Sequence, residues 1–187
     1  MVTNVQEQLI EQFKKDLPKT KSKFSVGTFL DGCRHDTAWS EYPADIESTA
    51  TRWHCYRSDT RYAEAFDLLE RDDGPVEVVI MIGDHFDDSL QQTIALAQKL
   101  HEVKGTRIFA LTEASENSQV WRSLTQVSES AGGLALPMPQ EDEVGLVVRE
   151  IVQSVIYGTL GLKKALPAPE TPFLLDVRDK ITHNDSI

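Results

Sequence analysis

The chain has 187 residues, of which 40% are hydrophobic and 26% charged, the composition of a single soluble globular domain. Its 30 acidic and 19 basic residues give a net charge of −11, which argues against binding to the phosphate backbone of nucleic acids. Two cysteines exclude a disulfide scaffold, the N-terminus is polar rather than signal-like, and no apolar run approaches the ~20 residues that span a bilayer, so we expect a cytoplasmic protein without membrane contact.

The first part of the chain predicts a helix followed by a hairpin. A capping box at Thr3–Gln6 precedes apolar residues at helical spacing, and Pro18 ends this helix. Phe24–Leu30 then has the pattern of a strand, and the turn signal Asp31–Gly32 leads into a second strand over Cys33–Trp39. We expect this antiparallel hairpin to lie at an edge of the sheet.

Beyond residue 58, helical and strand patterns alternate. Helices are predicted around Tyr62–Leu69, Leu90–Leu100, Val120–Val127 and Val144–Leu160, and strands over Val76–Ile82, Arg107–Leu111 and Leu134–Leu136. The run at Val76–Ile82 is nearly all β-branched or apolar, as expected of a central strand covered on both faces. This alternation predicts an α/β fold with a doubly wound, mostly parallel open sheet.

A change of composition marks the C-terminal part of the chain. Lys163–Pro172 holds three prolines in six residues and is typical of an extended linker. Phe173–Val177 then predicts one more short buried strand. We therefore divide the chain into a domain over 1–165, a linker over 166–172 and a C-terminal strand or tail over 173–187.

Acidic residues gather after the predicted strand Val76–Ile82. Asp84 follows its carboxyl end, and Asp87 and Asp88 come just before the next helix. Ligands bind beyond the carboxyl ends of strands in open α/β sheets, and grouped carboxylates suit Mg²⁺. Alternatively, Asp87 or Asp88 caps the helix that follows.

Two further groups of residues are candidate sites. Ser58, Asp59 and Thr60 stand at the start of the Tyr62 helix, where an N-cap is the simpler interpretation. Zinc ligands are offered by Cys33, His35, His54 and Cys55. Adjacent strand residues point to opposite faces, which makes the last two a poor pair of ligands, so we do not expect zinc. Neither a Gly-rich phosphate loop nor a nucleophile elbow is present.

Taken in order, these segments resemble the von Willebrand factor A (vWA) family, in particular its small bacterial members. The resemblance spans residues 4–165 and rests on the Phe24–Leu30 strand with its Asp31–Gly32 turn, Trp39, Trp53–Thr60, Val78–Asp84, Ile108–Leu111 and Gly132–Gly133. It implies a three-layer sandwich of the vWA or Rossmann-like kind.

In that family a metal-ion-dependent adhesion site lies on top of the sheet. It combines an Asp-x-Ser-x-Ser motif after the first strand with a threonine and an aspartate from two later loops. By resemblance, Thr60 is the threonine and Asp84 the aspartate. The residues that would face a partner beside this site are Ser58, Asp59, His85, Asp87 and Asp88. A carboxylate of a partner protein typically completes the metal's coordination, so the resemblance implies a protein-interaction module rather than an enzyme.

The chain departs from this pattern because no strand with Asp-x-Ser-x-Ser precedes the first predicted helix. Phe173–Ile181 resembles such a strand running into its metal loop, with Asp176 in the aspartate position. We hypothesise that it fills the open slot of the sheet, either in cis, as in a circular permutant, or by exchange between two protomers of a homodimer. The alternatives are a disordered tail and a domain completed by another chain.

In this alignment the two serine positions hold Arg178 and Lys180. Their positive charge would repel Mg²⁺ and could pair with Asp84 instead. We therefore expect a degenerate adhesion site that binds Mg²⁺ weakly or not at all. Two alternatives stay open: a haloacid-dehalogenase-like phosphatase, suggested by Gly83–Asp88, and a metal-free structural or regulatory subunit.

Overall fold

A computed structural model describes residues 11–12, 14–15, 23–28, 34–35, 38–42, 44–45, 47, 59–159, 166 and 168–184. Its elements are β1 (Gly27–Thr28), β2 (Arg34–His35), α3 (Tyr62–Arg71), β3 (Val78–Ile82), α4 (Leu90–Lys104), β4 (Arg107–Thr112), α5 (Gln119–Ser130), β5 (Ala135–Pro137), the 3-10 helix η1 (Glu141–Glu143), α6 (Val144–Thr159) and α7 (Pro172–Asn184). Of the predicted first helix, only residues 11–12 and 14–15 are described, and these are helical. Within the described ranges, no helix is both long and apolar enough to cross a bilayer.

The predicted antiparallel hairpin is confirmed. Gly27 of β1 pairs with His35 of β2, and a bridge between Phe24 and Ser40 extends the pairing. Its expected place at an edge of the main sheet is wrong, because among the described strands the hairpin forms a two-stranded sheet of its own. The indole nitrogen of Trp39 donates a hydrogen bond to Asp72 at 2.7 Å, which ties the hairpin to the end of α3.

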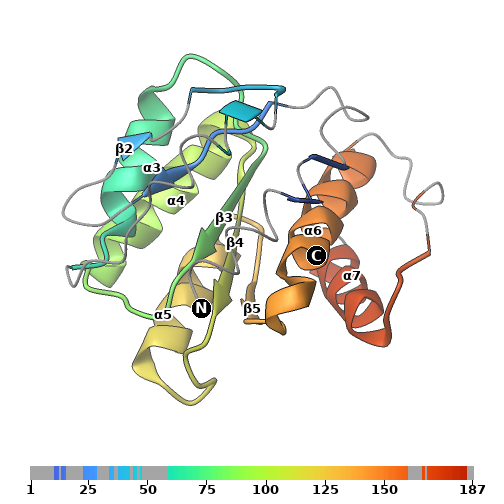
Figure 1. The fold of residues 1–187 in the computed structure, drawn as a ribbon. Helices are drawn as coiled ribbons and strands as arrows, with labels where there is room; N and C mark the ends of the chain where they lie inside the picture. The colour runs from blue at the N-terminus through green and yellow to red at the C-terminus, as the bar shows by residue number, and fades with distance from the viewer. Residues whose placement is uncertain are drawn as a thin grey trace.

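The main sheet is parallel, in the order β3-β4-β5, with Val78 level with Arg107 and Ala110 level with Ala135. Helices cover both of its faces, so the molecule has three layers (Figure 1). This confirms the doubly wound α/β prediction. Strand β4 lies between the two helical layers, and its buried side chains point alternately into an apolar cluster on each face of the sheet.

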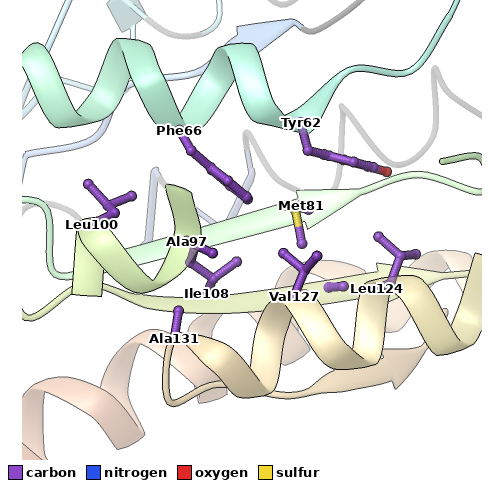
Figure 2. Packing of buried hydrophobic residues seen from close by; sticks show 10 residues of the cluster. Tyr62, Phe66, Met81, Ala97, Leu100, Ile108, Leu124, Val127 and Ala131 are labelled. Atoms are coloured by element: carbon purple, nitrogen blue, oxygen red, sulfur yellow. The ribbon is translucent and has the colours of Figure 1, made fainter. Parts of the chain in front are cut away.

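One cluster lies between the sheet and α3, α4 and α5. Ile108 and Ala110 of β4 meet Tyr62 and Phe66 of α3 there, together with Leu100 of α4 (Figure 2). The other cluster lies between the sheet and the pair α6 and α7, and it takes the intervening β4 residues Phe109 and Leu111. A strand whose successive side chains are all apolar is thus explained by a core on each face.

The prediction of a strand at Phe173–Val177 is wrong, because this segment begins α7. Thr171 caps the helix by accepting a hydrogen bond from the Leu174 backbone N–H at 3.2 Å, and Pro172 stands at the first helical position. Leu174, Val177 and Ile181 follow at helical spacing and are fully buried against α6. Since its own N–H groups bond within the helix, α7 does not supply the strand that the permutation hypothesis requires. The boundaries at residues 165 and 172 stay a prediction.

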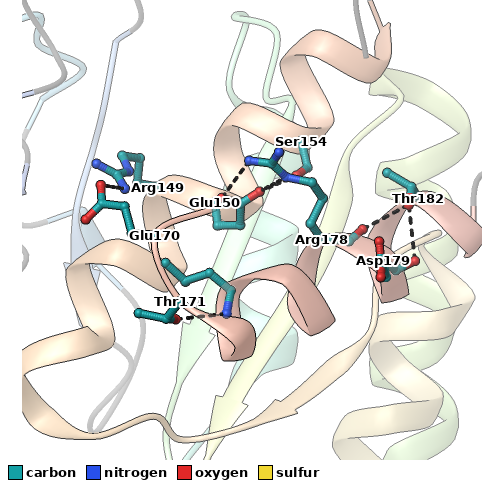
Figure 3. A network of polar contacts seen from close by, with 9 residues as sticks. Arg149, Glu150, Ser154, Glu170, Thr171, Arg178, Asp179 and Thr182 are labelled. Atoms are coloured by element: carbon teal, nitrogen blue, oxygen red, sulfur yellow. Dashed lines mark hydrogen bonds and ion pairs between the residues drawn. The ribbon is translucent and has the colours of Figure 1, made fainter. Parts of the chain in front are cut away.

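A buried ion pair joins α7 to α6 (Figure 3). The guanidinium of Arg178 lies 2.5 and 3.0 Å from the two carboxylate oxygens of Glu150, whose side chain is only 2% exposed. Ser154 donates a further hydrogen bond to Glu150 at 3.3 Å. The expected pairing of Arg178 or Lys180 with Asp84 is therefore wrong: Lys180 instead pairs with the exposed Asp176 at 2.8 Å.

Removing one partner of this buried pair should be costly, because the other charge stays buried without compensation. We expect Arg178→Ala to lower the free energy of unfolding by about 3–5 kcal/mol, and the double variant Glu150→Leu/Arg178→Met to lower it far less. Urea unfolding measures both. Lys180→Ala, which breaks the exposed pair on the same helix, is the control and should cost less than about 1 kcal/mol. Equal losses for the Arg178 and Lys180 variants would contradict the structural role assigned to Glu150.

Candidate functional site

The candidate site is the loop Gly83–Ser89 between β3 and α4. Because β3, β4 and β5 are parallel, their carboxyl ends share one edge of the sheet, and this loop lies there. The start of α3 lies against it, since the backbone N–H of Asp87 donates to the carbonyl of Thr60 at 3.1 Å. The structure thus brings together two segments that the sequence singled out separately.

The carboxylates of Asp87 and Asp88 both accept backbone hydrogen bonds from the start of α3. Asp87 accepts from the N–H of Thr60 at 2.8 Å, and Asp88 accepts from the N–H of Ala63 at 2.9 Å. The N-cap residue of α3, Arg61, makes no side-chain capping bond. Asp88 therefore satisfies an amide that would otherwise lack a partner at this helix start.

The expectation that Asp87 or Asp88 caps the following helix is wrong in one respect. The capped helix is α3, which precedes the loop, whereas the N-cap of α4 is Ser89. The physical reason is spatial: the carboxyl end of β3 and the amino end of α3 meet at the same edge of the sheet. Burial raises the pKa of Asp88 and outweighs the lowering by its backbone hydrogen bonds.

Tyr62 holds the middle of the loop, a role that the sequence analysis missed. Its hydroxyl donates to the carbonyl of His85 at 3.3 Å, and its ring stacks on Phe86 with the centroids 5.8 Å apart. The residue is 1% exposed, and this burial raises the pKa of the phenol. The sequence had shown Tyr62 only as part of an apolar helix face.

Asp84 and His85 form the exposed part of the loop. The Nδ1 atom of His85 lies 2.7 Å from a carboxylate oxygen of Asp84, and the two side chains are 68% and 58% exposed respectively. The hydrogen bond that the His85 ring donates to the Asp84 carboxylate raises the pKa of His85. A protonated His85 therefore competes with any cation for Asp84.

The other predicted site residues are only partly assembled. Thr60 is buried at the start of α3, and Asp59 is exposed and pairs with Arg61 at 3.0 Å. Asp176 lies on helix α7, exposed and paired with Lys180, so it does not follow a strand as the resemblance implied. Ser58, Cys33, His54 and Cys55 lie outside the described residues, while His35 is in β2. In the part of the chain that the structure describes, no three His, Cys, Asp or Glu residues are grouped to hold a metal ion.

An open hollow of about 470 Å³ lies at the carboxyl ends of β4 and β5. Its lining residues are Thr112, Glu113, Ala114, Ser115, Glu116, Trp121, Pro137, Met138, Pro139 and Gln140. Trp121 and Met138 are half-buried there, and Glu113 and Glu116 are exposed at its rim. Ligands in open α/β sheets bind beyond the carboxyl ends of the strands, and the hollow lies in that position. The sequence analysis identified none of the residues that line it.

Comparison with known proteins supports the fold. No family model matches the chain, and no curated protein matches it. Among solved structures, the chain is similar to a von Willebrand factor type A protein from Catenulispora acidiphila, with a TM-score of 0.66 at 13% sequence identity. The match covers 83% of this chain and 39% of that one. The vWA-like fold expected from the sequence is thus confirmed.

Loss of the Asp88 carboxylate should destabilise the start of α3. We expect Asp88→Ala to lower the free energy of unfolding by about 1–2 kcal/mol, as for a lost helix cap. Asp88→Asn keeps an acceptor for the N–H of Ala63 and should cost less than half as much. Because the pKa of Asp88 is raised, its charge weakens folding above the pKa of the unfolded chain. The cost of Asp88→Ala should accordingly grow as the pH falls toward 3.8. Thermal or urea unfolding at several pH values measures this, and a cost that shrinks on acidification would count against the assignment.

The Asp84–His85 contact can be tested by titration. NMR of the imidazole should give a pKa for His85 above its ordinary 6.5, and Asp84→Asn should return it toward that value. Any stability that the pair contributes is fully present below 6.5 and is lost as the pH rises through the raised pKa. Asp87→Asn is the matched control, since Asp87 raises the pKa of His85 less than Asp84 does. An unchanged pKa in Asp84→Asn would refute the contact.

Proposed function

We propose that this chain is a non-enzymatic protein-interaction module of the vWA type, with an adhesion site that binds Mg²⁺ weakly or not at all. One observation carries the proposal. The loop that would hold the metal on this fold has its carboxylates engaged elsewhere, with Asp87 and Asp88 on backbone N–H groups of α3 and Asp84 on His85.

A metal ion would have to compete with these contacts. If Asp87 or Asp88 turned toward a cation, an amide at the start of α3 would lose its acceptor, at a cost of about 1–3 kcal/mol if it stayed buried. Among the residues that the structure describes, Thr60 and Asp84 are the only counterparts of the family's metal ligands near the carboxyl ends of the strands. Mg²⁺ demands six ligands in near-octahedral geometry, so most of them would be water.

The partner surface that we propose is the end of the sheet where the carboxyl ends of its strands lie. It joins the loop of Asp84 to the hollow lined by Trp121 and Met138, where an apolar floor lies beside the exposed Glu113 and Glu116. With a net charge of −11 on the chain, this edge favours a partner that offers lysine or arginine. The family resemblance implies an acidic partner group instead. Such a group could approach this acidic surface only if a bound metal ion lay between the two.

The phosphatase alternative is weaker. It requires an Asp-x-Asp pair at a strand end. The comparable residues in this chain, Asp176 and Asp179, differ in spacing and belong to helix α7. A metal-free structural or regulatory subunit is the limiting case of the proposal, in which the fold alone presents the binding surface.

Thermal melting with millimolar Mg²⁺ or Mn²⁺ tests the state of the adhesion site. A ligand at 100 times its dissociation constant adds about 2.7 kcal/mol, which raises the midpoint by several degrees. We expect no such shift for the wild-type chain. A shift that disappears in Asp84→Ala but persists in Asp73→Ala, an exposed carboxylate at the opposite edge of the sheet, would contradict the proposal and indicate a working metal site.

The absence of enzymatic activity is tested separately. We expect no hydrolysis of p-nitrophenyl phosphate above background with Mg²⁺ present. Turnover that is lost in Asp84→Asn and retained in Asp73→Asn would refute the non-enzymatic assignment and favour the phosphatase.

A further inference from the structure

Strand β3 has the composition of a central strand but the position of an edge strand. All five of its residues are apolar, and within the described residues it pairs with β4 alone. Four of the five are partly exposed, and Met81 is the buried exception, whereas five of the six β4 residues are buried. This difference in exposure is expected of a strand that has one neighbour, as β3 has among the described strands.

The hydrogen-bond pattern shows which backbone groups face away from β4. The carbonyl of Glu77 accepts from Arg107, and the N–H of Gly83 donates to Leu111, so these residues face β4. Backbone groups alternate in direction along a strand, so the N–H and C=O groups of Val78, Ile80 and Ile82 point to the open side. They offer a row of donors and acceptors to a further strand.

Both faces of β3 belong to a core. Val79 and Met81 pack in the cluster under α3 to α5, while Val78, Ile80 and Ile82 pack against the cluster of α6 and α7. A strand added at this edge would continue both clusters, so its successive residues should be apolar on both sides. Such an exposed apolar edge is a template for pairing between chains.

We infer that the open edge of β3 pairs with the β3 edge of a second copy of this chain, antiparallel and centred on Ile80. The register is self-complementary. A two-fold axis at Ile80 sets it opposite its own copy and sets Val78 opposite Ile82, so every outward N–H meets an outward C=O.

Side chains and charges agree with this register. Cross-strand neighbours on each face are apolar, and beyond the strand Glu77 would lie opposite Gly83 and Val76 opposite Asp84, so no like charges oppose each other. The two three-stranded sheets would then form one continuous sheet. Because each copy carries a net charge of −11, added salt should strengthen the association.

A proline at position 80 should weaken the pairing between two copies without breaking the hydrogen bonds within one chain. The N–H of Ile80 faces away from β4, so Ile80→Pro removes an outward donor and leaves every β3–β4 hydrogen bond in place. Ile80→Val is the matched control, since it also shortens the side chain but keeps the N–H. Sedimentation equilibrium should show a wild-type dimer, a dissociation constant about 10- to 100-fold higher for Ile80→Pro, and little change for Ile80→Val.

Amide hydrogen exchange on the wild-type chain gives a readout that does not depend on how the proline variant folds. The N–H groups of Val79 and Met81 should be protected at every protein concentration. Those of Val78, Ile80 and Ile82 should become protected only as the concentration rises and dimers form. Fast exchange of these three amides in a chain that stays monomeric would overturn the inference. So would protection independent of concentration, because the edge would then be covered within one chain.

Discussion

The start of helix α3 is held by carboxylates that lie on a loop 25 and 27 residues further along the chain. An α-helix leaves its first backbone amides without partners inside the helix. Here Asp88 and Asp87 accept from two amides at this point, and the loop is thereby fixed over the end of β3. Tyr62 and Phe86 add a stacked pair at the same point. The position of the loop, the engagement of its carboxylates and the exposure of Asp84 all follow from this contact.

This contact also supports the proposal that the adhesion site binds Mg²⁺ weakly or not at all. The family's metal is held by side chains that converge from several loops, whereas these carboxylates serve the structure of the loop itself. Under the proposed function, recognition depends on what this end of the sheet presents to another protein. In this chain the edge presents an acidic rim, a tryptophan and a methionine around an open hollow.

The periodic part of the sequence predicted its elements well. The alternation from Tyr62 to Leu160 gave the helices and the parallel strands, because each has one apolar face or a run buried on both sides. The error at Phe173–Val177 arose because a short apolar run fits a strand or a helix equally well. Thr171 and Pro172, a cap followed by a residue suited to the first helical position, were the local signal that would have decided between them. The partners of Asp88 and Arg178 could not be predicted, since each lies on an element far away in the sequence.

The last residue needed to complete each of the two apolar clusters lies at a very different position along the chain. The described residues of the cluster under α3, α4 and α5 all lie between Tyr62 and Ala135, whereas the cluster under α6 includes α7 residues as far as Ile181. During synthesis the first layer can therefore assemble while the opposite face of the sheet is still bare. Glu150 is made before the arginine that neutralises it, so α6 cannot settle with that charge compensated until α7 has emerged from the ribosome. Helix α7 thus completes the second core during vectorial folding, and until it emerges a chaperone that recognises bare apolar strands has a ready substrate.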